Sequence, residues 1–180
     1  MRALAVSTFA VVAIWAAGAA ADPVVFQPEG CDFQLSFPAA PSLTQQKQTT
    51  NRGDEVVTGK AELHLDVGGK ANILRAECSK IPHMGFMDEA ILSDNMRDLA
   101  DAYKLQSPGV AVLHNKLAGP VGRLHTRARS GGKDITLEIY RYTSASNIFD
   151  VWIGAEPDAF PSEATTAFLK SVKLNGQDIQ

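Results

Sequence analysis

Three side chains that could hold a soft metal ion lie close together in one segment of the chain. They are His83, Met84 and Met87, within the sequence Pro-His-Met-Gly-Phe-Met. Thioether sulfurs and imidazole nitrogens are the ligand types that select Cu(I). The methionines could instead pack this segment against a sheet, because methionine fills irregular gaps in protein cores. We favour packing and keep the copper site as the alternative.

Three further potential ligands, Glu62, His64 and Asp66, alternate along a segment with the pattern of a strand. Side chains two residues apart lie on the same face of a strand, so these three could meet one metal ion. The same alternation is typical of the solvated face of a half-buried strand. We favour the solvated face here.

No recognisable catalytic or cofactor-binding motif occurs in the sequence. Gly-x-Ser-x-Gly, the P-loop and Gly-x-Gly-x-x-Gly are all absent. The triplet Ser93-Asp94-Asn95 has no accompanying Ser-x-x-Lys and falls within an expected helix. We therefore expect no catalytic residue and no cofactor, and we rank a hydrolase only third among the functions.

A basic surface is predicted on a hairpin that turns at Gly131-Gly132. A two-residue turn pairs residues 123–130 with residues 133–140, and this register places the apolar side chains on one face. The opposite face has an excess of cationic groups and a tyrosine, which favours a protein partner. The candidate binding residues are Arg123, His125, Arg127, Arg129, Lys133 and Tyr140. The alternative is a face whose charges only keep the sheet solvated.

Residues 1–21 have the three parts of a secretory signal, namely one positive charge, an apolar run and a small-residue ending. Ala19 and Ala21 place the expected cleavage before Asp22. A retained membrane anchor is the alternative, which the cleavage site and the missing basic flank after the run disfavour. No second apolar segment is long enough to span a membrane. We therefore expect a protein of the bacterial periplasm, with the extracellular space as the alternative.

The composition fits one globular domain over residues 22–180, with residues 22–30 as an extended lead. The 180 residues are 45% hydrophobic and 21% charged, which excludes a disordered chain. The formal net charge is −3, and removal of Arg2 with the signal leaves −4. The chain therefore has no basic excess for binding phosphates, and we expect no nucleic-acid partner.

The two cysteines, Cys31 and Cys78, are predicted to form a disulfide. An even number of cysteines in an exported chain favours a bridge. Cys31 shares the parity of Phe33 and Cys78 that of Leu74, so both thiols are expected on the inner faces of their strands. Two separate buried thiols are the alternative.

Apolar periodicity predicts an α+β domain, with a largely antiparallel sheet of about six strands and helices on one side. A long helix is expected over residues 88–105 and a short one after Ser162. Residues 42–54 form either a loop or a weak edge strand. Pro108-Gly109 is expected to stop the long helix, and Gly119-Pro120 to form a turn. The expected strands cover residues 33–37, 57–65, 71–81, 110–117, 123–129, 134–142 and 148–155.

The opening Phe-Gln-Leu-Ser-Phe-Pro-Ala-Ala-Pro of residues 33–41 resembles the start of PsbP/Mog1-like domains and their exported bacterial relatives. The order of hairpin, central helix and meander, and the closing residues 168–174, are also similar to that family. The resemblance implies an α-β-α sandwich and mostly non-catalytic accessory or assembly roles, and it supplies no catalytic residues.

These observations together favour an exported, non-catalytic protein that binds a protein partner or assists a complex of the bacterial envelope. The alternative is a periplasmic carrier of a small ligand or of copper. It would use a sheet face or the segment with His83, Met84 and Met87.

Overall fold

The structure is a computed structural model that describes residues 22–50, 53–82, 84–85 and 87–179. Seven strands form an antiparallel sheet in the order β3-β4-β5-β9-β8-β7-β6. Their bounds are Ser42–Thr49 (β3), Glu55–Val67 (β4), Lys70–Lys80 (β5), Gln106–Asn115 (β6), Gly119–Ser130 (β7), Lys133–Thr143 (β8) and Asn147–Ala155 (β9). The predicted α+β class is confirmed, with one more strand in this sheet than expected.

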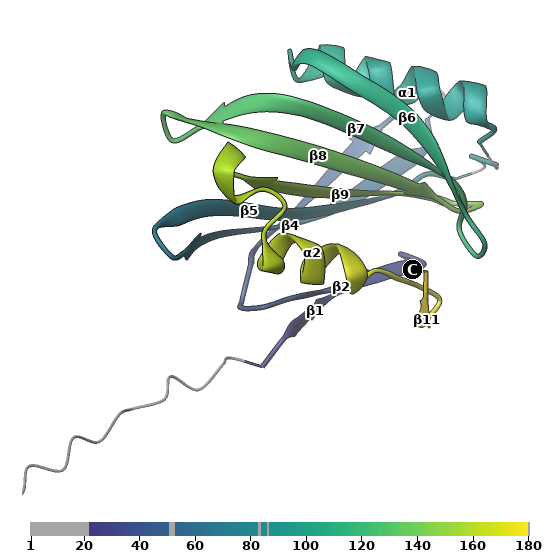
Figure 1. Cartoon of the computed structure of the whole chain (residues 1–180). Helices are drawn as coiled ribbons and strands as arrows, with labels where there is room; N and C mark the ends of the chain where they lie inside the picture. The colour runs from purple at the N-terminus through teal and green to yellow at the C-terminus, as the bar shows by residue number, and fades with distance from the viewer. Residues whose placement is uncertain (1–21, 51–52, 83, 86, 180) are drawn as a thin grey trace, which may run out of the picture.

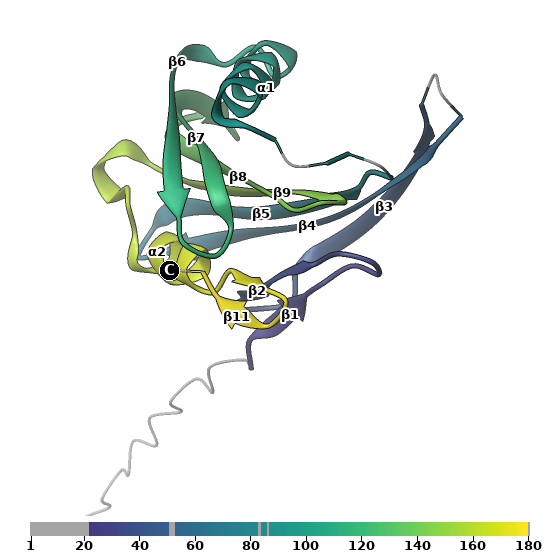
Figure 2. The ribbon, with the colours of Figure 1, turned by 90° about the vertical axis from the view of Figure 1, so that its right-hand side faces the viewer.

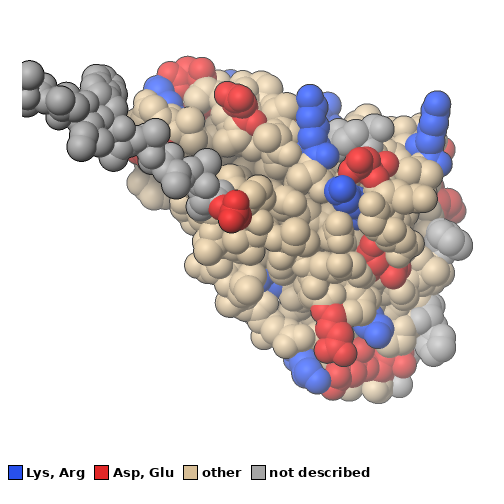
Figure 3. Space-filling model, turned by 90° about the horizontal axis from the view of Figure 1, so that it is seen from below, with Lys and Arg blue, Asp and Glu red and all other residues tan. Residues whose placement is uncertain are grey.

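A second, smaller sheet and the helix α2 (Glu163–Lys170) cover one face of the seven-stranded sheet. The smaller sheet has the order β1-β2-β10-β11, with bounds Val24–Phe26, Phe33–Phe37, Lys173–Leu174 and Gln177–Asp178. Phe33 stacks on Phe149 of β9 with ring centroids 5.3 Å apart. The alternating apolar side chains of β2 thus form part of the main core. On the outer surface seen from below, the charged residues are scattered (Figure 3).

The helix α1 (Glu89–Ala102) covers the opposite face of the seven-stranded sheet, so the two helices do not lie on one side as predicted (Figure 1). Asp88 caps α1 by accepting a hydrogen bond from the Ile91 N–H at 2.8 Å. Leu92 and Met96 of α1 are fully buried. They contact the sheet at Gly122 of β7, where a side chain would collide with Met96.

Strand β9 explains why both faces of the sheet are covered. Eight of its nine residues are buried, with Phe149 and Val151 in the core beside α2 and Trp152 in the core beside α1. An apolar run on both faces is typical of a central strand between two layers.

Helix α1 ends at Ala102, three residues before the predicted end at Leu105. The backbone conformation of Lys104 explains this earlier end. Lys104 has a left-handed backbone with φ 52°, and its N–H donates to the Asp101 carbonyl at 3.0 Å. The Leu105 N–H donates to the Ala100 carbonyl at 2.9 Å, which completes a Schellman motif. The chain enters β6 directly after this motif, so Pro108-Gly109 lies within a strand and does not end the helix.

Two local predictions are settled by the hydrogen-bonded strands. Residues 42–49 form the edge strand β3, one of the two alternatives for this segment. The turn between β6 and β7 comprises residues 116–118, and the expected turn at Gly119-Pro120 is wrong because these residues already pair with β6.

The disulfide between Cys31 and Cys78 is confirmed, with 6.3 Å between the Cα atoms. It joins the segment before β2 to β5, and both cysteines are buried. The predicted signal, residues 1–21, lies outside the described residues. Among the described residues, no helix is long and apolar enough to cross a membrane.

Candidate functional site

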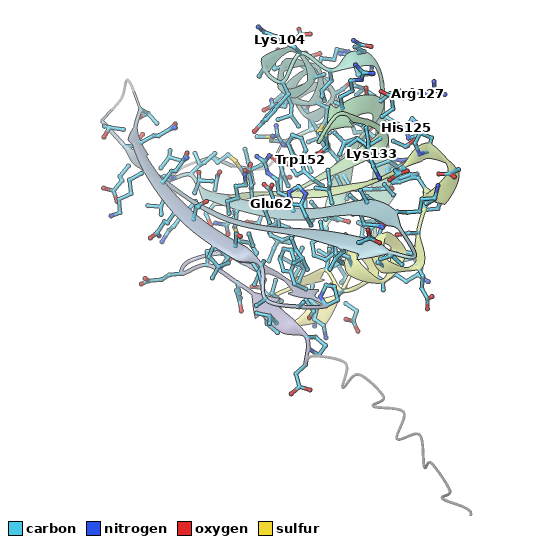
Figure 4. The ribbon with its side chains drawn as sticks, turned by 90° about the vertical axis from the view of Figure 1, so that its left-hand side faces the viewer. Glu62, Lys104, His125, Arg127, Lys133 and Trp152 are labelled. Carbon is cyan, nitrogen blue, oxygen red and sulfur yellow. A yellow bond between two sulfur atoms is a disulfide. The ribbon has the colours of Figure 1, made fainter. Side chains whose placement is uncertain are left out.

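A cleft of about 850 Å³ lies between the C-terminal end of α1 and the face of the seven-stranded sheet that α1 covers. We call it the α1 cleft. Figure 4 shows Lys104 at the end of α1, with Trp152 and Glu62 on the sheet across from it. The lining residues come from β4, β5, β7, β8 and β9, from residues 103–106 after α1, and from the short 3-10 helix η1 (Pro157–Ala159).

The floor of the α1 cleft is apolar. Ile135, Leu137 and Trp152 are buried, and Ile73 is half-buried beside them. They come from three strands, β8, β9 and β5, in which every second side chain points to the α1 side. The indole N–H of Trp152 is buried and has no hydrogen-bond acceptor among the described residues.

Arg75 and two aromatic rings form one wall of the cleft. The Arg75 guanidinium lies 4.5 Å from the Trp152 ring centroid and 5.6 Å from that of Tyr103. It donates a hydrogen bond to the Tyr103 hydroxyl at 3.0 Å and another to Glu77. Cation–π contacts of this kind hold Tyr103 over Trp152, although Tyr103 itself is 45% exposed.

Lys104 and Arg127 are among the exposed cationic side chains on the rim of the α1 cleft. Neither forms an ion pair within the described part of the chain. Arg129, also on the rim, is bound to Asp134 at 2.9 Å. Lys104 belongs to the Schellman motif at the end of α1, and Arg127 of β7 pairs with Gln106 at the start of β6. Both cations therefore lie next to the segment that joins α1 to β6.

The only carboxylate on the cleft wall formed by β4 is Glu62, and it is held in its ionised form. Lys60 contacts it at 2.7 Å and the His64 Nε2 at 2.8 Å. These hydrogen bonds, that of Lys60 first, lower the pKa of Glu62 to about 2. Glu62 therefore stays charged at neutral pH.

The predicted hairpin register is confirmed at every pair, from Arg123 with Tyr140 to Ser130 with Lys133. The six candidate binding residues nevertheless do not form one basic surface. Arg123, His125 and Tyr140 converge on Glu138, which is 5% exposed. The hydroxyl of Tyr140 donates to Glu138 at 2.6 Å and the His125 Nδ1 lies 3.0 Å from it.

The pKa values in this cluster follow from burial and from these bonds. Burial alone would raise the pKa of Glu138, but hydrogen bonds from Arg123, Tyr140 and His125 outweigh it and hold the pKa below its ordinary value. Burial and the neighbouring Glu138 raise the pKa of Tyr140 to about 12. Glu138 is thus the buried anion that organises this part of the hairpin.

The other members of the predicted basic surface are divided between two places. Lys133 binds Glu156 at 2.6 Å, and Glu156 also accepts the Ala71 N–H at 3.2 Å. Arg127 and Arg129 line the α1 cleft. Among these six residues, Arg127 alone has no carboxylate partner in the described part of the chain.

The predicted metal ligands are placed as follows. His83 lies outside the described residues, and Met84 and Met87 are half-buried before α1. Asp66 does not join Glu62 and His64, because it accepts the Gly69 N–H at 2.7 Å in the β4–β5 turn. No group of three or more His, Cys, Asp or Glu side chains that could hold a metal ion occurs among the described residues.

The α1 cleft itself was not predicted from the sequence, although a signal for it exists. In β5 and β9 apolar or aromatic residues occur at both parities, as Ile73 beside Leu74 and Trp152 beside Val151. Apolar residues on both faces of a strand indicate that both faces of the sheet are covered. Arg75, at the parity of Ile73, places a charged group on the face that lines the cleft. A comparison of the sequence with models of known protein families finds no match, and a comparison with curated proteins finds no significant match.

Proposed function

We propose that the protein is an exported, non-catalytic binding or assembly protein of the bacterial envelope that holds a segment of a protein partner in the α1 cleft. The observation that carries this proposal is the combination of an apolar floor at Trp152 and Leu137 with the wall formed by Arg75 and Tyr103 and with the exposed cation Lys104. Aromatic and arginine side chains around an apolar centre are typical of protein interfaces.

The state of the carboxylates supports binding over acid–base catalysis. A general acid at neutral pH needs a carboxyl whose pKa is raised toward the working pH. The pKa of Glu62 is instead lowered to about 2, and that of Glu138 is also lowered. Both groups serve as fixed anions that hold neighbouring cations in place.

Export to the periplasm is supported by the signal pattern of residues 1–21 and by the Cys31–Cys78 disulfide. Disulfides persist in oxidising compartments such as the bacterial periplasm. The resemblance of residues 33–41 to the PsbP/Mog1-like start also supports an accessory role.

A small-ligand carrier is the second candidate, because about 850 Å³ lies within the range of small-molecule sites. A protein segment is favoured because the rim of the α1 cleft is open to solvent along β6 and β7, where Lys104, Gln106 and Arg127 are exposed. An open rim admits a continuing chain, whereas small-ligand sites enclose most of their ligand.

A photo-crosslinking amino acid at Gln106, on the rim, tests the proposal in cells that produce the protein. The matched control is the same amino acid at Gln177, an exposed residue of β11 outside the cleft. A discrete protein adduct at Gln106 but not at Gln177 is the expected result. No adduct, or the same adducts at both positions, would contradict it, and a small molecule retained in native mass spectrometry would favour the carrier.

A further inference from the structure

Strand β3 leaves one edge of the seven-stranded sheet open. Its single neighbour is β4, and all eight residues from Ser42 to Thr49 are exposed. In an antiparallel strand every second residue directs both its N–H and its C=O to the same side. The outer side of β3 therefore presents a row of backbone donors and acceptors along the margin seen in Figure 2.

This edge lacks the features by which sheets usually block further pairing. The pairing of β3 with β4 runs from Ser42 to Thr49 without a bulge. The strand has no proline, and its one charge, Lys47, is bound to Glu55 at 3.1 Å. The opposite edge strand, β6, differs, because it contains Pro108 and a register shift and is packed against α1.

We propose that β3 pairs with β3 of a second copy of this chain, antiparallel and about a two-fold axis, to form a continuous sheet through a dimer. The axis must stand perpendicular to the sheet, so paired residues have the same parity and one residue pairs with itself. The two registers with the greatest overlap place Gln45 or Gln46 on the axis.

The composition of β3 fits these two registers. With Gln45 on the axis, Lys47 faces Leu43 of the second copy, and with Gln46 on the axis it faces Gln45. Lys47 thus never faces its own copy, and like charges directly opposite each other are avoided. Paired glutamine amides at the centre can hydrogen-bond to one another, since each has donors and an acceptor. A neutral, self-complementary strand favours a second copy over a charged partner.

The dimer would also bring two binding sites together. A perpendicular axis keeps the α1 face of both copies on the same side of the joined sheet. Both α1 clefts would then open in one direction, and a partner with two contact segments would gain avidity. The dimer itself depends only on β3 and is independent of what the α1 cleft binds.

Sedimentation of the mature chain over a range of concentrations tests the proposal. The native chain and the control Gln177→Lys are expected to reach twice the mass of one chain. Gln45→Lys/Gln46→Lys places like charges at the axis and is expected to raise the dissociation constant about tenfold or more. Circular dichroism checks that this variant folds. A native chain that stays monomeric, or a dimer that the lysines do not weaken, would overturn the proposal.

Single cysteines give a second, geometric test. A residue on the axis lies about 4.5–5.5 Å from its copy, which is within disulfide reach. Gln45→Cys or Gln46→Cys should therefore form a disulfide-linked dimer under mild oxidation, whereas Thr49→Cys should not. The native cysteines do not interfere, because both are buried in the Cys31–Cys78 bridge. Equal crosslinking at Thr49, or none at Gln45 and Gln46, would contradict this pairing.

Discussion

Arg141 of β8 and Asp150 of β9 are register partners and form a two-bonded ion pair buried between the sheet and α1. The Arg141 Nε donates to Asp150 Oδ1 at 2.8 Å and its Nη2 to Oδ2 at 2.7 Å. The side chains are only 10% and 9% exposed. Arg141 also reaches the Asn95 carbonyl of α1 at 3.5 Å, so the pair connects the central strands to the helix.

Removal of one partner of this pair should strongly destabilise the fold. Arg141→Met leaves the Asp150 carboxylate buried without its cation, and we expect a loss of about 3–5 kcal/mol in urea unfolding. The double variant Arg141→Met/Asp150→Leu should recover much of this loss, because no charge is left buried. Arg129→Met is the control, since its pair with Asp134 is exposed and should be worth about 1 kcal/mol or less. Equal losses for Arg141→Met and Arg129→Met would contradict this prediction.

Gly122→Ala should loosen α1 from the sheet. A Cβ at this position would lie 2.7 Å from the Met96 Cγ and 2.9 Å from its sulfur. Overpacking of this kind costs about 1–3 kcal/mol, measurable as a lower urea midpoint. Gly109→Ala is the matched control, because the nearest atom to its Cβ would be the His125 carbonyl oxygen at 3.7 Å. The prediction is wrong if both variants unfold at the same urea concentration.

Lys104→Gly should separate stability from binding. Glycine adopts the left-handed backbone of this position at no steric cost, so we expect a gain of roughly 0.5–1 kcal/mol in unfolding free energy. The same change removes a rim cation of the α1 cleft and should reduce the crosslinked adduct at Gln106. Asn175→Gly, at a second non-glycine residue with a positive φ, should leave the adduct unchanged. An undiminished adduct in Lys104→Gly would exclude Lys104 from the site.

Glu138→Gln should make the fold less dependent on pH. The hydrogen bonds to Glu138 hold its pKa below the ordinary value in the folded chain. The ionised carboxylate therefore stabilises the fold fully at any pH above the pKa that Glu138 has in the unfolded chain, and this stabilisation disappears as the pH falls through the lower pKa of the folded chain. Urea unfolding at pH 7 should show a clear loss for Glu138→Gln, and the gap to the native chain should shrink toward pH 3. A gap that stays constant over this range would contradict the role of Glu138 as a buried anion.

Loss of the disulfide should lower stability without changing the strand order. Cys31→Ser/Cys78→Ser releases the cross-link between the segment before β2 and β5, and we expect a loss of about 2–4 kcal/mol in unfolding free energy. Thiol titration of the denatured, unreduced native chain should find no free thiol. Two reactive thiols in that titration would contradict the bridge.

The confirmed predictions rest on alternation within neighbouring strands. The register of β7 with β8 followed from a two-residue turn at Gly131-Gly132, and the apolar face of Leu124, Thr126 and Ala128 agreed with it, because a slip by one residue would expose that face. The disulfide followed from the parity of Cys31 and Cys78 with their buried neighbours. In both cases the relevant pattern lies within a few residues of the chain, where side-chain direction depends only on strand geometry.

Apart from the end of α1 and the turn before β7, the wrong or missing predictions concern contacts between segments that the sequence pattern does not join. The periodicity of α1 identified its apolar stripe at Leu92 and Met96 but not the sheet face that this stripe would meet. The basic hairpin was predicted as one surface, whereas Glu138 of β8 binds Arg123 and Glu156, in the loop after β9, binds Lys133. A charge pattern in sequence does not show which carboxylates will face it.

The α+β class, the register of β7 with β8 and the bridge between Cys31 and Cys78 could be predicted from the sequence, since strand alternation and the parity of each cysteine are local properties. The folded structure was needed to show that α1 and α2 lie on opposite faces, that Trp152 forms part of the floor of a cleft, and that β3 remains an open edge. These features depend on which strands become neighbours. The strand order depends on how much apolar surface the whole chain buries, which cannot be deduced from the pattern of any one segment.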